Sequence, residues 1–244
     1  MHEKAGHLVV ELSDGTAVAG RAVIVATGAH YRRLAAERLD DFENRGVYYA
    51  ATDLEARQCA GDPVVVVGGG NSAGQAAVFL ADRDSPVTVV IRGPDLNAGM
   101  SRYLVDRIDS HPGITVSTRT EVTGLEGHEA LESLRMTGPN GQTAVRCAAL
   151  FSFIGADPQS SWLSGCAALD SGGFILTDRA LTDDELDERW EAIGRGPLPY
   201  ETSSPGLFAV GDVRSGSTKR VAAAVGEGSA AVRSVHEHLA YTHR

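Results

Sequence analysis

The chain has 244 residues with a formal net charge of −10 at pH 7, and 43% of its residues are hydrophobic. This composition is typical of a globular protein, and the acidic balance argues against a nucleic-acid partner because it repels a phosphate backbone. No apolar run approaches the roughly 20 residues that cross a bilayer, and no basic, apolar leader opens the sequence. We therefore expect a cytoplasmic protein without a membrane partner.

The cysteines and histidines are scattered along the chain. Cys59, Cys147 and Cys166 form no CxxC pair, and the eight histidines show no metal-ligand spacing. We therefore expect free thiols, a reducing compartment and no metal site.

The first 62 residues predict a hairpin followed by a linker. Leu8–Leu12 and Ala22–Ala26 are apolar runs on either side of the turn signal Asp14-Gly15. The second run continues into Ala-Thr-Gly-Ala, which we interpret as a strand that stops at a glycine. Residues 30–62 are polar and irregular, and they end in a Gly-Asp-Pro triplet that is typical of a linker.

From Val64 onward, strands and helices alternate. The apolar spacing predicts strands at 64–67, 87–91 and 114–117, and helices at 72–80 and 101–109. Residues 131–154 predict antiparallel strands around a Pro-Asn-Gly-Gln turn. The strand–helix–strand spacing predicts an α/β fold with a parallel sheet.

The last third of the chain is less regular. Residues 178–204 interrupt the pattern with an acidic short helix at 182–190 and several prolines, and we interpret this segment as a surface insertion. A strand is predicted at 206–213, and an amphipathic helix at 221–240.

The stretch VVVVGGGNSAGQAA carries the clearest functional signal. Gly68, Gly70 and Ala73 fit the G-x-G-x-x-G/A pattern directly after a strand and at the start of a helix. The first glycine allows a sharp turn, the second allows close approach of a pyrophosphate, and the alanine allows the helix to pack on the strand. With Asn71 and Ser72 at the helix N-terminus, the pattern predicts a dinucleotide site. The alternative is a tight structural turn.

The next strand bears on which dinucleotide binds. An NAD site usually places a carboxylate after this strand, whereas here the strand ends in Arg92. A guanidinium suits a 2′-phosphate, so we expect NADPH rather than NADH. Arg102 and Arg107 follow on the next helix, as further phosphate ligands or as solvated helix surface.

Five stretches together resemble one family. They occur in the order ATGA (26–29), GGGNSA (68–73), FIGADP (153–158), GLFAVGD (206–212) and KRVAAAVGEG (219–228). The chain is similar along nearly its whole length, apart from residues 178–204, to the bacterial thioredoxin reductases, flavoproteins with two dinucleotide-binding folds.

The resemblance implies an NADPH-binding Rossmann-like domain inserted in an FAD-binding domain. The expected division is 1–54 and 158–244 for the FAD-binding domain and 55–157 for the NADPH-binding domain. The residues implied at FAD are Thr27, Gly28, Ala29, Gly211, Asp212, Arg220, Val221 and Ala222. Asp212 would accept hydrogen bonds from the ribityl hydroxyls, and the helix that begins near Val221 would direct its N-terminus at the flavin.

Two departures from the family pattern change the expected chemistry. The redox pair Cys-Ala-Thr-Cys is represented here by Ala50-Ala-Thr-Asp53, so no thiolate pair is available for thiol–disulfide exchange. The family's first glycine-rich unit precedes its ATGA turn by on the order of 100 residues, far more than one βαβ unit of roughly 30 residues, whereas ATGA begins here at residue 26. We therefore expect an incomplete FAD-binding domain.

Three functional hypotheses remain open at this point. The first is an NADPH-dependent FAD oxidoreductase, with no catalytic residue assigned, that passes electrons to a small molecule or a protein such as a ferredoxin-like acceptor. The second is a non-catalytic NADPH-binding sensor or regulatory module. The third is a truncated fragment of a longer reductase. The family resemblance implies a homodimer.

Overall fold

The computed structural model describes residues 1–241 and divides the chain into two compact units. Unit 2 comprises Tyr31–Gly155, and unit 1 comprises Met1–His30 together with the chain from Ala156 onward. The predicted boundary after residue 54 differs from this division, because residues 39–48 supply core side chains and a strand to unit 2. In chain order, unit 2 lies between the two segments of unit 1.

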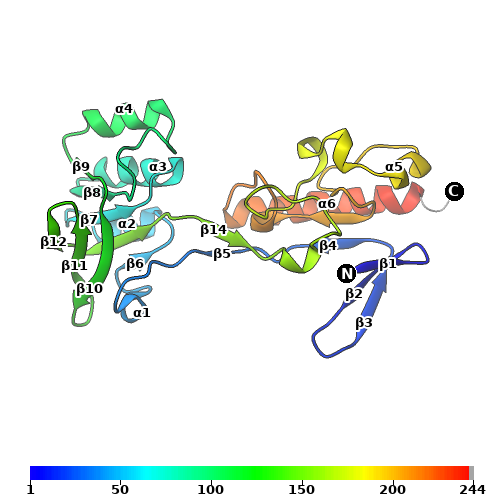
Figure 1. The fold of residues 1–244 in the computed structure, drawn as a ribbon, viewed down its shortest axis with the longest axis horizontal. Coiled ribbons are helices and arrows are strands. Elements are labelled where there is room, and N and C mark those ends of the chain that lie inside the picture. Colours follow the sequence, from blue (N-terminus) through cyan, green and yellow to red (C-terminus); the bar gives the residue numbers. More distant parts are fainter. Residues whose placement is uncertain (242–244) are drawn as a thin grey trace. The chain divides into compact units, whose positions relative to one another are not determined.

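Unit 2 contains a five-stranded parallel sheet in the order β6-β13-β7-β8-β9, which confirms the predicted α/β class (Figure 1). Its strands are β6 (Val47–Tyr48), β7 (Val64–Val67), β8 (Val87–Val90), β9 (Ile114–Ser117) and β13 (Ala149–Ser152). All four residues of β7 are buried, as is typical of a central parallel strand with both faces covered.

Helices cover one face of this sheet. They are α2 (Asp53–Gln58), α3 (Asn71–Ala81) and α4 (Arg102–Ser110), close to the predicted helices 72–80 and 101–109. Ala73 and Ala77 of α3 are fully buried, and small side chains at these positions allow the helix to approach the sheet closely. Leu104 and Ile108 of α4 are buried in the same core.

An antiparallel sheet covers the other face of the parallel sheet. It consists of β10 (Glu121–Gly127), β11 (Leu131–Gly138) and β12 (Gly141–Arg146). The prediction that all of 131–154 is antiparallel was therefore wrong for β13, which joins the parallel sheet instead. Its side chains are buried on both faces, which suits a central parallel strand better than a hairpin edge.

The segment predicted as a linker contains regular structure. It forms α1 (Leu39–Phe42), the short strand β6 and helix α2. Phe42 is buried in the core beneath the antiparallel sheet, so tertiary packing orders a sequence with weak local periodicity. Thr52 and Glu55 form a capping box at the start of α2, which satisfies amides of its first turn.

Unit 1 contains a small parallel pair and a three-stranded antiparallel sheet. The parallel pair is β4 (Val23–Val25) with β15 (Leu207–Ala209); the antiparallel sheet is β1 (His2–Lys4), β2 (His7–Glu11) and β3 (Ala17–Gly20). The predicted hairpin partner of 8–12 was therefore wrong: β3 takes this place, while β4 pairs with a strand about 180 residues later. Val25, Leu207 and Ala209 are buried in one core cluster, which this pairing brings together.

The remaining elements of unit 1 surround this parallel pair. They are α5 (Glu188–Ile193), α6 (Val221–Tyr241) and the 3₁₀ helices η1 (Ser161–Leu163), η2 (Asp178–Ala180), η3 (Asp183–Glu185) and η4 (Gly211–Val213). Two short strands, β5 (Ala29–Tyr31) and β14 (Ala156–Pro158), pair with each other. Among residues 1–241, no helix is long and apolar enough to span a bilayer.

Residues 178–204, predicted as a surface insertion, are exposed or half-buried except at Trp190 and at 201–204, where the segment packs into unit 1. Trp190 is 5% exposed, and its indole N–H donates to the Ser203 carbonyl at 2.8 Å. Glu201 is fully buried and accepts two hydrogen bonds from the Arg195 guanidinium, at 2.7 and 3.0 Å. The charged residues that suggested a solvated surface therefore include a buried ion pair, and the acidic run 182–190 is divided between η3 and α5.

Candidate dinucleotide sites

The glycine turn after β7 has the geometry that the motif predicts. Gly68 has φ +144°, and a Cβ on it would lie 2.5 Å from the Phe153 carbonyl oxygen and 3.2 Å from the Ala73 Cβ. Ala73 itself is fully buried. Gly68 is therefore required by the fold, because neither a backbone carbonyl nor a packed helix can move aside for a side chain.

Gly70 is different, because its surroundings leave space for a side chain. It is the N-cap residue of α3 with φ −98°, and the nearest atom to its Cβ position is the Gly99 oxygen at 3.9 Å. No side chain within residues 1–241 caps α3, and no acidic residue lies in its first turn. Its first amides are therefore open to an anion beside Gly70.

The two residues after Gly70 lie on the exposed start of the helix. The Asn71 side-chain oxygen accepts a hydrogen bond from the Ser101 amide at 2.7 Å, and Ser72 is exposed. Asn71 thereby ties the turn to the loop that precedes α4. The side chain is committed to the protein, while the backbone of the turn stays accessible.

Arg92 lies at the same sheet edge as the glycine turn. β7 and β8 pair with Val67 opposite Val90, and the Gly68 amide donates to the Val90 carbonyl at 3.1 Å. Arg92 follows two residues later, exposed, and its side chain makes no hydrogen bond or ion pair within the described chain. Its guanidinium is therefore available to a ligand at the turn.

The other two predicted arginines are engaged in ion pairs. Arg102 opens α4 and pairs with Asp106 on the same helix at 2.9 Å, with both side chains largely exposed. Arg107 pairs with Asp82 at 3.2 Å. Asp82 follows the last residue of α3, about 18 Å along the helix from Gly70 at 1.5 Å per residue. Arg107 is therefore held at the end of α3 that lies away from the glycine turn.

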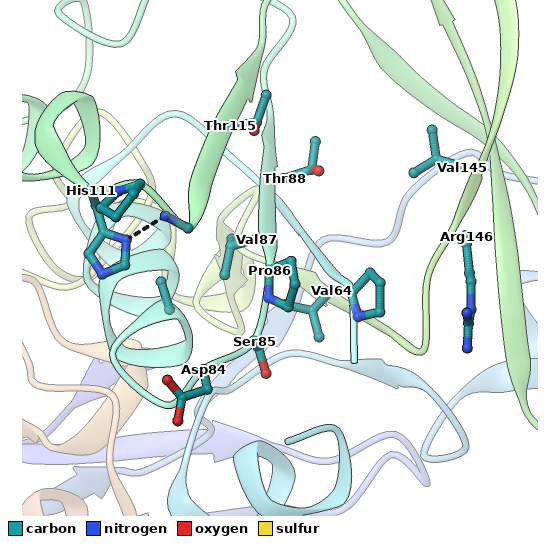
Figure 2. Close-up of a pocket in the computed structure, with 14 residues that line it drawn as sticks. Val64, Asp84, Ser85, Pro86, Val87, Thr88, His111, Thr115, Val145 and Arg146 are labelled. Carbon is teal, nitrogen blue, oxygen red and sulfur yellow. Dashed lines mark hydrogen bonds between the residues drawn. The ribbon is translucent and has the colours of Figure 1, made fainter. Parts of the chain in front are cut away.

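A separate hollow lies at the opposite, amino-terminal edge of the parallel sheet (Figure 2). It has a volume of about 490 Å³, and its lining includes Pro86, Val87, His111 and Arg146. The Nδ1 atom of His111 accepts the Gly113 amide at 3.1 Å. This hollow is distinct from the carboxyl-terminal edge, where the glycine turn lies.

In unit 1, the fold brings together two groups of predicted residues. β4 and β15 are parallel neighbours with Val25 opposite Ala209, and the Val210 amide donates to the Val25 carbonyl at 3.0 Å. Thr27–Ala29 and Gly211–Asp212 follow these strands, so they share one carboxyl edge. This is the position at which open parallel sheets bind ligands.

Gln159 holds the first of these turns in place. Its carbonyl oxygen accepts the Thr27 hydroxyl at 2.6 Å and the Trp162 indole N–H at 3.1 Å, and its amide donates to the Gly28 carbonyl at 2.9 Å. Gly28 has φ +71°, a left-handed conformation that favours glycine. The sequence gives no sign of this role of Gln159, because its bonds to Thr27 and Gly28 join distant parts of the chain and use the backbone atoms of Gln159.

The second turn presents Asp212. Gly211 is buried with φ +70°, and a Cβ on it would lie 3.3 Å from the Ala224 Cβ of α6. The Asp212 side chain is half-buried and makes no hydrogen bond or ion pair with residues 1–241. Its carboxylate is therefore uncommitted, like the guanidinium of Arg92 in unit 2.

The last three predicted residues lie at the start of α6. Arg220, Val221 and Ala222 are exposed, with Val221 at 82%. The Arg220 guanidinium donates to the neighbouring Lys219 carbonyl at 2.9 Å, and no acidic residue lies in the first turn of α6. The positive end of this 21-residue helix is thus accessible.

The three cysteines are separate and structural in character. Cys59 and Cys147 are buried, and Cys166 donates to the Met1 carbonyl at 2.9 Å. Burial raises the pKa of the Cys147 thiol to about 12 and also raises that of Cys59. Within residues 1–241, no group of three or more possible metal ligands occurs.

The chain is similar to known proteins in sequence and in fold. Residues 2–228 match the family model described as pyridine nucleotide-disulphide oxidoreductase. The chain is 29% identical over 221 residues to a thioredoxin reductase of Mycoplasmopsis pulmonis (strain UAB CTIP), covering 90% of this chain and 65% of that protein. It is 29% identical over 241 residues to an NADH dehydrogenase of Bacillus subtilis (strain 168), covering 97% of this chain and 43% of that one.

The fold is also similar to a solved structure. The crystal structure of thioredoxin reductase from Streptococcus pyogenes MGAS5005 superimposes with a TM-score of 0.75 at 27% identity, over 98% of this chain and 71% of that one. The chain thus spans less than two thirds of the two curated relatives above.

Proposed function

The chain belongs to the pyridine nucleotide-disulphide oxidoreductase family, and on that basis we propose that it is an NADPH-dependent flavoprotein oxidoreductase that transfers a hydride from NADPH to FAD. One observation carries the proposal: each unit ends its parallel strands in a glycine turn, followed by one charged side chain that has no hydrogen-bond or ion-pair partner among residues 1–241. These side chains are Arg92 in unit 2 and Asp212 in unit 1.

The unit 2 edge suits NADPH. The open backbone at Gly70 and the uncapped start of α3 suit a pyrophosphate, since they offer amides and the positive helix end. Arg92 suits the 2′-phosphate, because a guanidinium can donate two parallel hydrogen bonds to it. Arg102 could shift from Asp106 to a phosphate at small cost, because an exposed ion pair contributes little.

The unit 1 edge suits the ribityl and flavin parts of FAD. Asp212 would accept hydrogen bonds from ribityl hydroxyls, and the exposed start of α6 would face the developing negative charge of the ring. Thr27–Ala29, fixed by Gln159, would line the adenosine side. The bound flavin supplies the hydride chemistry itself, and the protein binds and orients it.

We propose that electrons leave the flavin without a local dithiol. Residues Ala50–Asp53 replace the pair at this position, and Thr52 and Asp53 are engaged in the cap of α2 and in an ion pair with Arg83 at 2.7 Å. The acceptor would be a small molecule or a protein that takes electrons directly. A homodimer is proposed from the family resemblance.

The testing experiment is an absorbance spectrum of the purified chain after incubation with FAD and gel filtration. Retained flavin bands that bleach on addition of NADPH support the proposal. One variant locates the nicotinamide nucleotide: Gly70→Asp should abolish NADPH binding, because its carboxylate would repel the pyrophosphate, while the surroundings of Gly70 leave room for the side chain. Unchanged affinity would refute the assignment of the glycine turn.

The alternative function, a non-catalytic NADPH-binding module, is favoured by the replacement of the dithiol at Ala50–Asp53. It predicts a colourless protein after gel filtration that still binds NADPH. The same experiment therefore separates the two functions.

A further inference from the structure

Glu227 on α6 contacts the turn that presents Asp212. Its side chain is 11% exposed, and its Oε2 accepts the Gly211 amide at 2.7 Å. The same carboxylate accepts the Arg214 guanidinium, with Nη2 at 2.5 Å from Oε1 and Nε at 3.2 Å from Oε2. One carboxylate thus bonds to residues on both sides of Asp212.

Arg214 is itself held from a distant part of the chain. Its guanidinium lies over the Tyr200 ring at 5.5 Å, and it donates to the Ser215 carbonyl at 3.1 Å. The Tyr200 amide in turn donates to Asp178 Oδ2 at 2.9 Å. The segment first interpreted as a surface insertion therefore reaches the turn through Tyr200 and Arg214.

Two residues that connect this segment to Arg214 have a left-handed backbone conformation, which is uncommon for residues other than glycine. Asp178 and Tyr200 are non-glycine residues with φ of +37° and +65°. Such backbone persists when the surrounding contacts over-determine it, and it is concentrated at functional sites. A buried carboxylate is likewise disfavoured unless several donors satisfy it, as Gly211 and Arg214 do here.

Burial raises the pKa of Glu227, but hydrogen bonds from Arg214 and from the Gly211 amide outweigh this effect. The pKa therefore lies below its usual range, and Glu227 is charged at neutral pH. The pKa of Arg214 is raised, first by its hydrogen bond to Glu227. The pair is thus ionised on both sides, which gives the bonds to the turn their strength.

We propose that Glu227 and Arg214 are positioning residues of the flavin site, which hold the Gly211–Val213 turn so that the Asp212 carboxylate meets the ribityl hydroxyls of FAD. This inference rests on the proposed function. Asp212 has no partner of its own within residues 1–241, so its direction is set by the backbone of the turn, and Glu227 fixes that backbone through the Gly211 amide. Tyr200 and Arg214 keep Glu227 in place.

The test compares the intact wild-type chain with Glu227→Gln and Glu227→Ala. Titration of each with FAD, followed by flavin fluorescence, should show affinity that falls roughly tenfold or more for Glu227→Ala. The FAD affinity of Glu227→Gln should lie between those of the wild type and Glu227→Ala. The glutamine side-chain oxygen can still accept the Gly211 amide, but it lacks the negative charge that pairs with Arg214. Glu237→Gln, exposed on the same helix, is the matched control and should bind FAD like the wild type.

A second measurement needs no flavin. In ¹⁵N-labelled, flavin-free protein, hydrogen exchange of the Gly211 amide should accelerate roughly tenfold or more in Glu227→Ala. If Glu227→Ala unfolds, Arg214→Lys replaces it, since lysine keeps the charge but loses the two-point contact. That variant should weaken FAD binding in the same direction.

The outcomes separate the two ideas. Wild-type binding of FAD with unchanged affinity in Glu227→Ala and Arg214→Lys, or with unchanged Gly211 exchange, overturns the positioning role and leaves the proposed function standing. A wild-type chain that does not bind FAD overturns the proposed function and this inference with it. Equal loss of affinity in Glu237→Gln also overturns the inference, because the effect would then not depend on contact with the turn.

Discussion

Replacement of Gly68 by alanine tests how much of the dinucleotide motif serves the fold. The new Cβ would meet the Phe153 carbonyl oxygen at 2.5 Å and its carbon at 3.0 Å. These are backbone atoms at the end of β13, in the middle of the parallel sheet, and they cannot rotate away. The alanine would also have to adopt φ +144°, a conformation that is unfavourable for residues other than glycine.

The cost can be estimated from these two effects. Forced backbone conformation costs on the order of 1–3 kcal/mol. Overpacking of a rigid core costs about 1–3 kcal/mol more. We therefore expect Gly68→Ala to lower the free energy of unfolding of unit 2 by about 2–6 kcal/mol. With a urea dependence of about 2 kcal/mol per molar, the midpoint should fall by roughly 1–3 M.

The assay is urea unfolding followed by far-UV circular dichroism, with hydrogen exchange of residues 64–81 to locate the effect. Gly61→Ala is the matched control. Gly61 lies in the same unit with φ +80°, but no atom lies within 4 Å of its Cβ position, so it carries the conformational cost without the clash. The difference between the two variants isolates the contact with Phe153.

Equal midpoints for Gly68→Ala and Gly61→Ala would refute this reasoning. They would mean that β13 and α3 relax around the added methyl group, and that Gly68 is needed for its backbone angle alone.

Three further predictions concern other parts of the chain. Arg92→Ala should weaken NADPH binding roughly 10- to 100-fold and leave NADH nearly unchanged, measured by fluorescence titration; equal loss for both nucleotides would contradict a 2′-phosphate contact. Burial raises the pKa of the Glu201 carboxyl, but hydrogen bonds from His238, Arg195 and two amides outweigh this effect and lower the pKa from 4.5 to about 2 in the folded chain. The ionised carboxylate therefore stabilises the fold by about 3 kcal/mol above pH 4.5, and this stabilisation is lost as the pH falls through 2. Urea midpoints followed by Trp190 fluorescence between pH 6 and 2 should fall more steeply in the wild type than in Glu201→Gln, and parallel curves would contradict this assignment. Cys147 should resist a thiol reagent at pH 8 in the native chain, with all three thiols reacting in urea; three fast native equivalents would disprove the burial of its thiol.

The βαβ core of unit 2 could be predicted closely from the sequence. Residues 64–117 carry their signals locally: an apolar run, glycines, and a helical period that starts at once. Here β7 and β8 are buried on both faces and the helices on one, so the local pattern and the tertiary environment agree. The glycine turn after β7 could be predicted for the same reason, because its signal is local.

The errors occurred where distant segments determine the structure. β4 pairs with β15, and Ala149–Ser152 joins a parallel sheet although it follows an antiparallel pair. Residues 178–204 are rich in charge, but Arg195 and Glu201 neutralise each other inside unit 1. A single sequence does not show which charged side chains form ion pairs in the fold. A segment with a buried ion pair can therefore have the same composition as a solvated surface segment.

The predicted site residues divide in the same way. The positions of Gly68, Arg92 and Asp212 follow from the strands before them, whereas the pairing of Arg107 with Asp82 depends on the packing of two helices. Glu227 was part of a quoted motif, between two glycines, yet its contact with Gly211 spans 16 residues. Its polar side chain between glycines in a helix interior, where glycine is disfavoured, was a signal that could have indicated a special role.

The nested order of the two units has a consequence for how the chain reaches its fold. The first and last parts of unit 2 meet, since the Arg32 amide donates to the Gly155 carbonyl at 3.0 Å. Formation of unit 2 alone therefore brings together the two halves of unit 1, which are separated in sequence by residues 31–155. Closing a loop of that length in a disordered chain costs about 4 kcal/mol of entropy. When unit 2 is already folded, β4 and β15 can pair without this entropy cost. Unit 2 should therefore fold first, and the pairing of β4 with β15 in unit 1 should follow.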